Sequence, residues 1–252
     1  MVLRKLTAAL AAGVTVDTVL NDASVVAGGT VSGEVLLTGG RTDHRVQHIA
    51  LDLQVVADNS DSGEQSFHRH LMATDLSLET ESVHALPFRF DLPADTPVNG
   101  FATESVPGVR IGVVTELALE RAFDKGDLDP LTIQPLPAQA AVLTAADALG
   151  FAFHRSLIVS RGLPTSTLPF RQKFEYWPTG EFAKAFTVMR LAFHCTTDAA
   201  EVYVEAEKTE GDASTGGRAG THMRLRHDED NAVDVLREEL RNLAERPGLF
   251  RR

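Results

Sequence analysis

Hydrophobic and polar residues alternate with a period of two along most of this chain. Residues 14–20 form one such segment, and residues 31–37 form the next, after the pair Gly28-Gly29. Such alternation is typical of β-strands with one buried face, and adjacent glycines are typical of turns. The first forty residues therefore predict two strands joined by a glycine turn.

The same pattern recurs through the rest of the chain. Pro93 ends the most regular of these alternations, since proline cannot continue a central strand. We expect the sequence DKGDLDP, residues 124–130, to form a turn. The further predicted strands cover residues 49–55, 67–76, 86–92, 109–122, 151–153, 168–176, 189–195 and 202–206.

Helical periodicity is confined to three segments. Residues 2–12 carry Leu3, Leu6 and Leu10 on one face. Residues 138–149 are rich in alanine and leucine and stop at Gly150. Residues 230–244 form the third predicted helix, with an apolar face that ends before Pro247.

The predicted helix at 138–149 divides the chain into two lobes, with a boundary near Pro137. Residues 1–137 are expected to form an N-terminal β-sandwich lobe with a short N-terminal helix. Residues 138–252 are expected to form a C-terminal β-rich lobe with a connecting helix and a C-terminal helix. This predicts a mainly β fold of tandem β-sandwich lobes with a few short helices, and argues against folds that alternate strands with helices.

Composition narrows the functional classes. The formal net charge of −11 argues against nucleic-acid binding, which needs a basic surplus to neutralise phosphates. Cys195 is the only cysteine, so no intrachain disulfide can form and a reducing cytoplasm is expected. The apolar stretch after Arg4 and Lys5 is too rich in alanine to indicate a secretory signal.

Five segments resemble the SpoOM sporulation-control family in the family's order. They are VDTVLNDASVVAGGTVSGEVLLTGG (16–40), LPFRFDLPADTPVN (86–99), VVTELALERAFDKGDLDPLTIQPLP (113–137), ALGFAFHRS (148–156) and LPFRQKFEYWP (168–178). The resemblance implies an arrestin-like fold and a regulatory role exerted through partner binding. It implies no catalytic residue. Glu116, Glu120 and Arg121 depart from the more apolar stretch that we expect in the family.

Two histidine pairs are the strongest candidates for a metal or catalytic site. His68 and His70 lie two apart in a predicted strand and share one face, but no neighbouring carboxylate or cysteine completes a ligand set, which favours a solvated outer face. His194 and Cys195 point to opposite faces, and Cys195 shares its phase with apolar residues, so we interpret it as a small buried hydrophobe. No metal, cofactor-binding or catalytic residue is predicted.

Two further features allow a binding or a structural interpretation. The segment GDASTGGR, residues 211–218, lacks the Lys-Ser/Thr of a phosphate loop and is interpreted as a hairpin loop. Trp177 lies on the more polar face of its strand, where it could anchor a partner. We favour the alternative that Trp177 packs against the predicted helix 138–149.

The sequence is best interpreted as a non-catalytic regulatory scaffold that binds protein partners of unknown identity. Self-association through the leucine stripe of residues 2–12 is expected, and the alternatives are packing of the stripe on the chain's own lobe or contact with a membrane surface. The rival hypothesis is a small-ligand binder or enzyme whose site lies between the two lobes.

Overall fold

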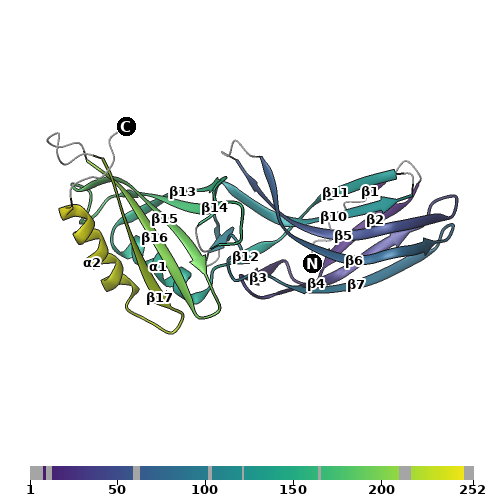
Figure 1. The fold of residues 1–252 in the computed structure, drawn as a ribbon, viewed down its shortest axis with the longest axis horizontal. Helices are drawn as coiled ribbons and strands as arrows, with labels where there is room; N and C mark the ends of the chain where they lie inside the picture. The colour runs from purple at the N-terminus through teal and green to yellow at the C-terminus, as the bar shows by residue number, and fades with distance from the viewer. Residues whose placement is uncertain are drawn as a thin grey trace. The chain divides into compact units, whose positions relative to one another are not determined.

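The computed structural model describes residues 8–9, 13–58, 63–101, 104–120, 122–163, 166–209 and 217–246. Its contacts divide the chain into two compact units (Figure 1). Unit 1 draws on Met1–Val56, Gly63–Pro93 and Arg110–Ile133, and unit 2 draws on Ala57–Ser62, Ala94–Val109 and Gln134–Arg252.

Unit 1 is a sandwich of two four-stranded antiparallel sheets. The first sheet has the order β1-β2-β4-β7 and the second has the order β11-β10-β5-β6, and a small β12-β3 ladder adjoins them. The strands are β1 (Ala8–Ala9), β2 (Thr15–Leu20), β3 (Ser24–Val26), β4 (Thr30–Thr38), β5 (His44–Ala57), β6 (Glu64–Leu78), β7 (Val83–Asp91), β10 (Val109–Leu119), β11 (Ala122–Pro130) and β12 (Thr132–Gln134).

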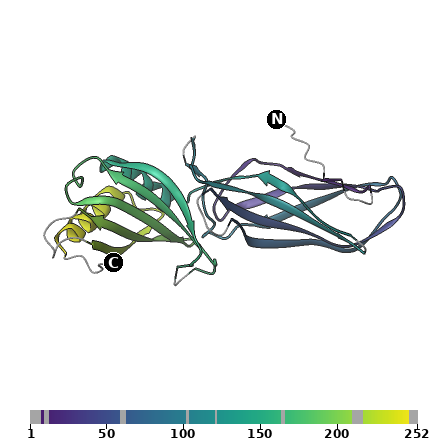
Figure 2. The same cartoon turned by 90° about the horizontal axis from the view of Figure 1, so that it is seen from above.

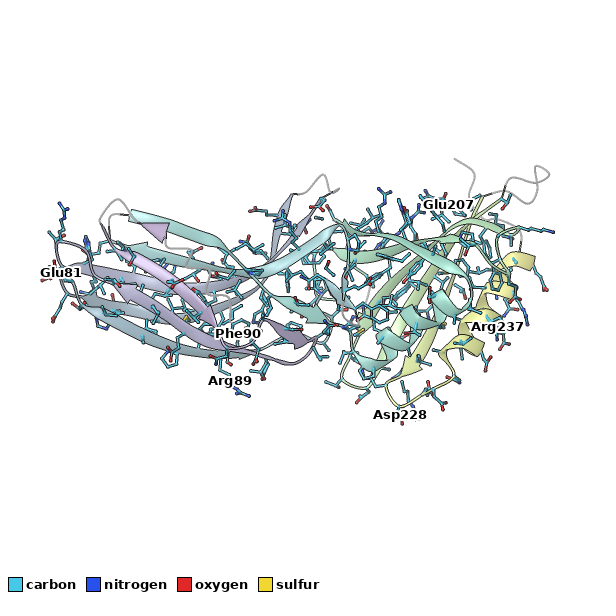
Figure 3. The ribbon with its side chains drawn as sticks, turned by 180° about the vertical axis from the view of Figure 1, so that it is seen from behind. Glu81, Arg89, Phe90, Glu207, Asp228 and Arg237 are labelled. Atoms are coloured by element: carbon cyan, nitrogen blue, oxygen red, sulfur yellow. The ribbon has the colours of Figure 1, made fainter. Side chains whose placement is uncertain are left out.

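The core of unit 1 lies between the two sheets. Val35 and Leu37 of β4 face it, as do Leu51 and Leu53 of β5, and all four are fully buried. The period of two that predicted these strands therefore identifies the buried face of each. Figure 3 marks Phe90, a largely buried residue of β7.

Unit 2 is one five-stranded antiparallel sheet with two helices packed on one face (Figure 2). The fold is mainly β and arrestin-like, but in unit 2 the helices take the place that a second sheet has in a sandwich. The elements are β8 (Gly100–Phe101), β9 (Glu104–Ser105), α1 (Pro137–Ala148), β13 (Phe151–Val159), β14 (Arg171–Pro178), β15 (Phe186–Cys195), β16 (Ala199–Lys208), β17 (Gly217–Arg226) and α2 (Ala232–Glu245).

Helices α1 and α2 lie close to the ranges expected from the sequence. Helix α1 ends where Gly150 adopts a positive φ of 78° and donates its amide to Asp147 O. A Cβ at Gly150 would lie 2.7 Å from the Cα of Gly180, so the tight approach of these two turns requires glycine. In the described part of the chain, neither helix is long and apolar enough to cross a bilayer.

The segment Ala94–Val109 belongs to unit 2, although it precedes Pro137 in sequence. The side chain of Gln172 fixes it, accepting a bond from Val98 N at 2.8 Å and donating one to Val98 O at 2.6 Å. Backbone amides buried in a loop need such partners, and here the partner is a strand of unit 2. Each unit is therefore built from separate stretches of the sequence, whereas the lobes expected from the sequence, 1–137 and 138–252, are each one continuous stretch.

Two local predictions are corrected. Ala8–Ala9 form strand β1 on the edge of β2, so the helix expected over residues 2–12 is wrong at these two residues, because strand pairing outweighs the helix propensity of alanine. The rest of that segment, with Leu3, Leu6 and Leu10, lies outside the described residues. The expected turn at 124–130 is part of β11, an edge strand, where charged residues are common.

Candidate functional site

A pocket of about 380 Å³ opens on unit 2, lined by the β8–β9 hairpin, helix α1 and strands β13 and β14. We call it the aromatic pocket. It is defined by Phe101, Leu143, Phe151, Phe153, Phe174 and Tyr176, and Glu104 and Asp147 also line it.

Strand alternation brings the rings of the pocket together. Phe153 of β13 is paired in register with Tyr176 of β14, and Phe151 and Phe174 each lie two residues away on the same face. The ring of Phe153 meets that of Tyr176 edge-on, with centroids 5.4 Å apart, and lies 6.4 Å from that of Phe174. Phe153 is 39% exposed, whereas Tyr176 is only 4% exposed. The rings thus form an apolar floor on which Phe153 is the most exposed ring.

The polar groups of the pocket are few. Burial, and then the charge of Asp147, raises the pKa of Tyr176, so its hydroxyl stays protonated. That hydroxyl donates no hydrogen bond within the described part of the chain. Glu104 and Asp147 are exposed and form no ion pair with another described residue. The pocket therefore offers the hydroxyls of Tyr176 and Ser105 as hydrogen-bond donors, together with two unneutralised carboxylates, while the Thr144 hydroxyl already donates to Ala140 O.

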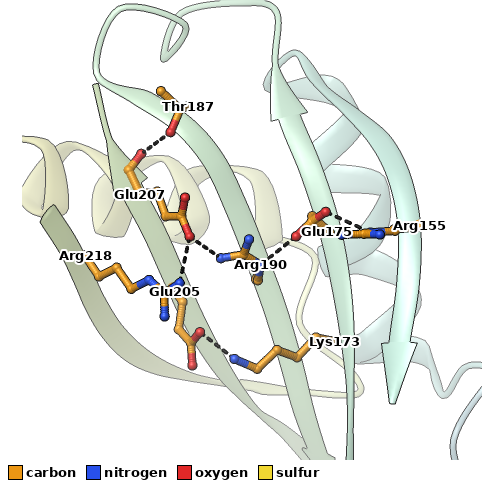
Figure 4. A network of polar contacts seen from close by, with 8 residues as sticks. All are labelled: Arg155, Lys173, Glu175, Thr187, Arg190, Glu205, Glu207 and Arg218. Carbon is orange, nitrogen blue, oxygen red and sulfur yellow. Dashed lines mark hydrogen bonds and ion pairs between the residues drawn. The ribbon is translucent and has the colours of Figure 1, made fainter. Parts of the chain in front are cut away.

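The opposite face of the same sheet carries a ladder of ion pairs (Figure 4). Glu175 lies between Arg155 and Arg190, at 3.0 and 2.7 Å, and Arg190 also contacts Glu207 at 2.7 Å. Burial works against ionisation of Glu175, but the two arginines outweigh it and hold the pKa of Glu175 below its ordinary value. Each carboxylate of this ladder is neutralised by a cation, in contrast to Glu104 and Asp147.

Unit 1 holds a second polar cluster on the outer face of β10, β5 and β6. Arg69 Nη2 donates to Glu116 Oε1 at 2.5 Å, Arg69 Nη1 donates to Asp52 at 2.9 Å, and His48 Nε2 lies 2.7 Å from Glu116 Oε1. The hydrogen bond from Arg69 lowers the pKa of Glu116 to about 2 despite its burial, and His48 adds to this effect. Glu116 is thus a buried, paired carboxylate.

His68 and His70 do not lie on a solvated outer face, so that interpretation is wrong. Their rings stack on Phe90, at centroid distances of 5.4 and 5.0 Å. In register they oppose Leu53 and Leu51, which places them on the inward face of β6. Burial, and then the neighbouring His70, lowers the pKa of His68. In the part of the chain that the structure describes, no group of three or more potential metal ligands is found.

The side chains of His194 and Cys195 point to opposite faces of β15, as expected. Cys195 is buried, with its Sγ 3.9 Å from Gln139 Oε1, and burial raises the pKa of the thiol to about 12. His194 Nδ1 lies 3.1 Å from Asp95 Oδ2, on the other face. The hydroxyl of Ser166 donates to the same Asp95 oxygen. Because Asp95 lies between the hydroxyl and the imidazole, these groups do not form a nucleophile activated by a base.

Trp177 does not pack on helix α1, so the favoured interpretation is wrong. It is 51% exposed, and its ring stacks on His154 of the adjacent strand with centroids 3.9 Å apart. Of the segment 211–218, only Gly217 and Arg218 are described, and both belong to β17. The remainder lies outside the described residues.

The aromatic pocket was missed by sequence reasoning. Part of it can be found in the sequence. Phe151 and Phe153 lie two residues apart in one predicted strand, and Phe174 and Tyr176 do so in the next, which predicts four rings on one sheet face. The sequence does not show that α1 leaves part of that face uncovered, because this depends on the packing of elements far apart in the chain.

The comparisons with known proteins agree on one family. The family model for the SpoOM protein matches residues 3–210. The sporulation-control protein spo0M of Bacillus subtilis (strain 168) is 28% identical over 199 residues, covering 77% of this chain and 75% of that protein.

The fold comparison covers more of the chain. The crystal structure of Spo0M from Bacillus subtilis, at 25% identity, matches with a TM-score of 0.76 and covers 91% of this chain and 98% of the other. All residues that define the aromatic pocket fall within the matched range of the family model. The chain therefore belongs to the SpoOM protein family.

Proposed function

We propose that this protein is a non-catalytic regulator in sporulation control, which acts in the cytoplasm by holding a protein partner at the aromatic pocket of unit 2. The regulatory part is supported by the similarity to the sporulation-control protein of Bacillus subtilis, which extends over most of both chains. The single cysteine supports the cytoplasmic location.

Partner binding is proposed because the ring of Phe153 is exposed. It lies beside the buried rings of Phe151, Phe174 and Tyr176 in the pocket. A phenyl ring left partly in water is stabilised when another apolar group covers it. Aromatic residues set in apolar pockets are the usual anchors of protein interfaces. The lining contains no histidine, cysteine or lysine, and its two carboxylates, Glu104 and Asp147, are exposed, which favours binding over acid–base catalysis.

The test replaces Phe153 with aspartate in cells that lack the parental gene, with Trp177→Asp as the matched control. Both residues are exposed aromatics, on adjacent strands but on opposite faces of one sheet. We expect Phe153→Asp to abolish control of sporulation and Trp177→Asp to preserve it, at equal protein levels and similar thermal stability. Loss of control with Trp177→Asp alone would contradict the proposal and make Trp177 the anchor.

A second candidate, a small-ligand binder that uses the same pocket, is favoured by its volume, since ligand sites typically span about 300–1,000 Å³. Native mass spectrometry of protein purified from its own cells distinguishes the two. A small molecule retained by the parent and lost in Phe153→Asp would support this second candidate. A parent with no added mass supports the protein partner.

A further inference from the structure

We propose that the aromatic pocket receives a partner segment in which an aromatic side chain stands beside lysine or arginine residues. This inference rests on the proposed function, because it specifies the chemistry of the partner at the same pocket.

The size of the pocket sets the size of the anchor. A dry cavity of about 150 Å³ is sufficient to hold benzene. At about 380 Å³, the aromatic pocket has room for a side chain as large as phenylalanine, tyrosine or tryptophan together with part of its backbone. A small aliphatic side chain would leave much of the pocket unfilled.

The lining favours an aromatic group over an aliphatic one of equal size. Phe153 already meets Tyr176 edge-on, and Phe174 meets Phe193 edge-on at 5.7 Å. An incoming ring could continue this edge-to-face packing, which adds to the free energy of burial. The π-faces of the same rings also attract cations.

The negative charges at the pocket favour a basic residue next to the inserted aromatic side chain. Glu104 and Asp147 stand on different elements, β9 and α1, and both are exposed and without an ion-pair partner among the described residues. On the opposite face of the sheet, Glu175 and Glu207 are each held by arginines. The two carboxylates of the pocket are therefore free to meet the cations of a partner, and the net charge of −11 favours the same approach.

The hydroxyl of Tyr176 favours a peptide over a small organic cation. Tyr176 is only 4% exposed, and its protonated hydroxyl has no hydrogen-bond partner among the described residues, whereas tyrosine hydroxyls in largely buried side chains usually have one. A backbone carbonyl next to the inserted side chain would accept this bond. A quaternary ammonium ligand has no acceptor to offer.

The experiment measures binding of capped peptides to the full chain by calorimetry. The first peptide is Gly-Phe-Arg-Arg-Gly, and the controls replace the two arginines with glutamines or with glutamates, or the phenylalanine with alanine. We expect the glutamine peptide to bind about fivefold or more weakly than the first, because two rim ion pairs are lost. The alanine and glutamate peptides should show no measurable binding.

The matched variant is Glu104→Gln combined with Asp147→Asn, and Glu34→Gln on an exposed position of unit 1 is its control. All three carboxylates are exposed, so the variants should fold as the parent does. The double variant should bind the arginine and glutamine peptides equally, and Glu34→Gln should retain the parental preference.

Three results would overturn the inference. The first is equal binding of the arginine and glutamate peptides by the parent. The second is tighter binding of benzyltrimethylammonium than of the arginine peptide, which would indicate a small-molecule site. The third is peptide binding that requires removal of residues 247–252, which would make this chain's own terminus the occupant. If the first result is found and Phe153→Asp still abolishes sporulation control, the proposed function stands and only the partner chemistry is wrong. The second and third results would also contradict a protein partner at the pocket.

Discussion

The ring of Phe153 rests edge-on against the ring of Tyr176, with centroids 5.4 Å apart, yet Phe153 is 39% exposed and Tyr176 is 4% exposed. Truncating a fully buried phenylalanine costs about 3–5 kcal/mol, because a cavity is left. Phe153→Ala should cost less, about 1–2 kcal/mol, since the ring already borders an open pocket. Phe174→Ala is the comparison, with the full cost expected. Urea unfolding measures both, and equal losses would mean that the pocket is closed in solution.

A hydroxyl pair links the two sheets of unit 1. Thr18 Oγ1 and Thr115 Oγ1 lie 2.5 Å apart in the core. Replacing either threonine with valine leaves the other hydroxyl unsatisfied, so each single variant should lose about 1–3 kcal/mol of unfolding free energy. The double variant should be less destabilised than the sum of the two, because no polar group is left unpaired. A double-mutant cycle by urea denaturation measures this coupling, and strict additivity would mean that the pair makes no bond.

Glu116 makes the stability of unit 1 depend on pH. Its pKa falls from the ordinary value of 4.5 to about 2 in the folded chain. The stabilisation is therefore complete above pH 4.5 and is lost as the pH falls toward 2. At pH 7, Glu116→Gln should cost about 1–2 kcal/mol, a modest value because Arg69 is 47% exposed. The difference in unfolding free energy between this variant and the parent should shrink as the pH falls from 4.5 to 2.

Denaturant unfolding at several pH values tests this expectation, and Glu34→Gln is again the control, as an exposed carboxylate of the same unit. If the difference in unfolding free energy between Glu116→Gln and the parent stays constant down to pH 2, the pKa of this carboxylate does not differ between the folded and unfolded chain.

Cys195 should be unreactive in the folded chain. Burial, and then the charge of Asp95, raises the pKa of its thiol to about 12, so very little thiolate exists at pH 8. An aromatic disulfide reagent should label it only when denaturant is present. Cys195→Ser should lower stability by about 1–2 kcal/mol, because a hydroxyl is placed in an apolar setting. Rapid labelling of the native protein would instead indicate an accessible thiol.

The sequence predicts the strands well where alternation is strong, as in residues 31–37 and 86–92, because the buried face of a strand recurs at every second residue. It fails where tertiary pairing overrides local preference, as at Ala8–Ala9 and across residues 124–130 of the edge strand β11. In both cases the partner strand, rather than the local composition, decides the structure.

The candidate site is less accessible to sequence reasoning. Glu116 stands out as a charge in an apolar strand, but its partners Arg69 and His48 come from two other strands. His68 and His70 were correctly placed on one face, but which face packs on Phe90 depends on the register with β5. The aromatic pocket joins residues from Phe101 to Tyr176, and no local pattern shows that a space remains between them.

Site-specific cross-linking in cells decides whether a partner occupies the aromatic pocket. Photo-reactive benzoyl-phenylalanine is placed at position 153, with position 177 as the control. Cross-linked products are digested and mapped by mass spectrometry, with and without an excess of the Gly-Phe-Arg-Arg-Gly peptide added to permeabilised cells. We expect position 153 to capture one partner segment with an aromatic residue beside lysine or arginine, and we expect the peptide to suppress this capture. Capture at position 177 instead, or only of segments of this chain at position 153, would contradict this expectation.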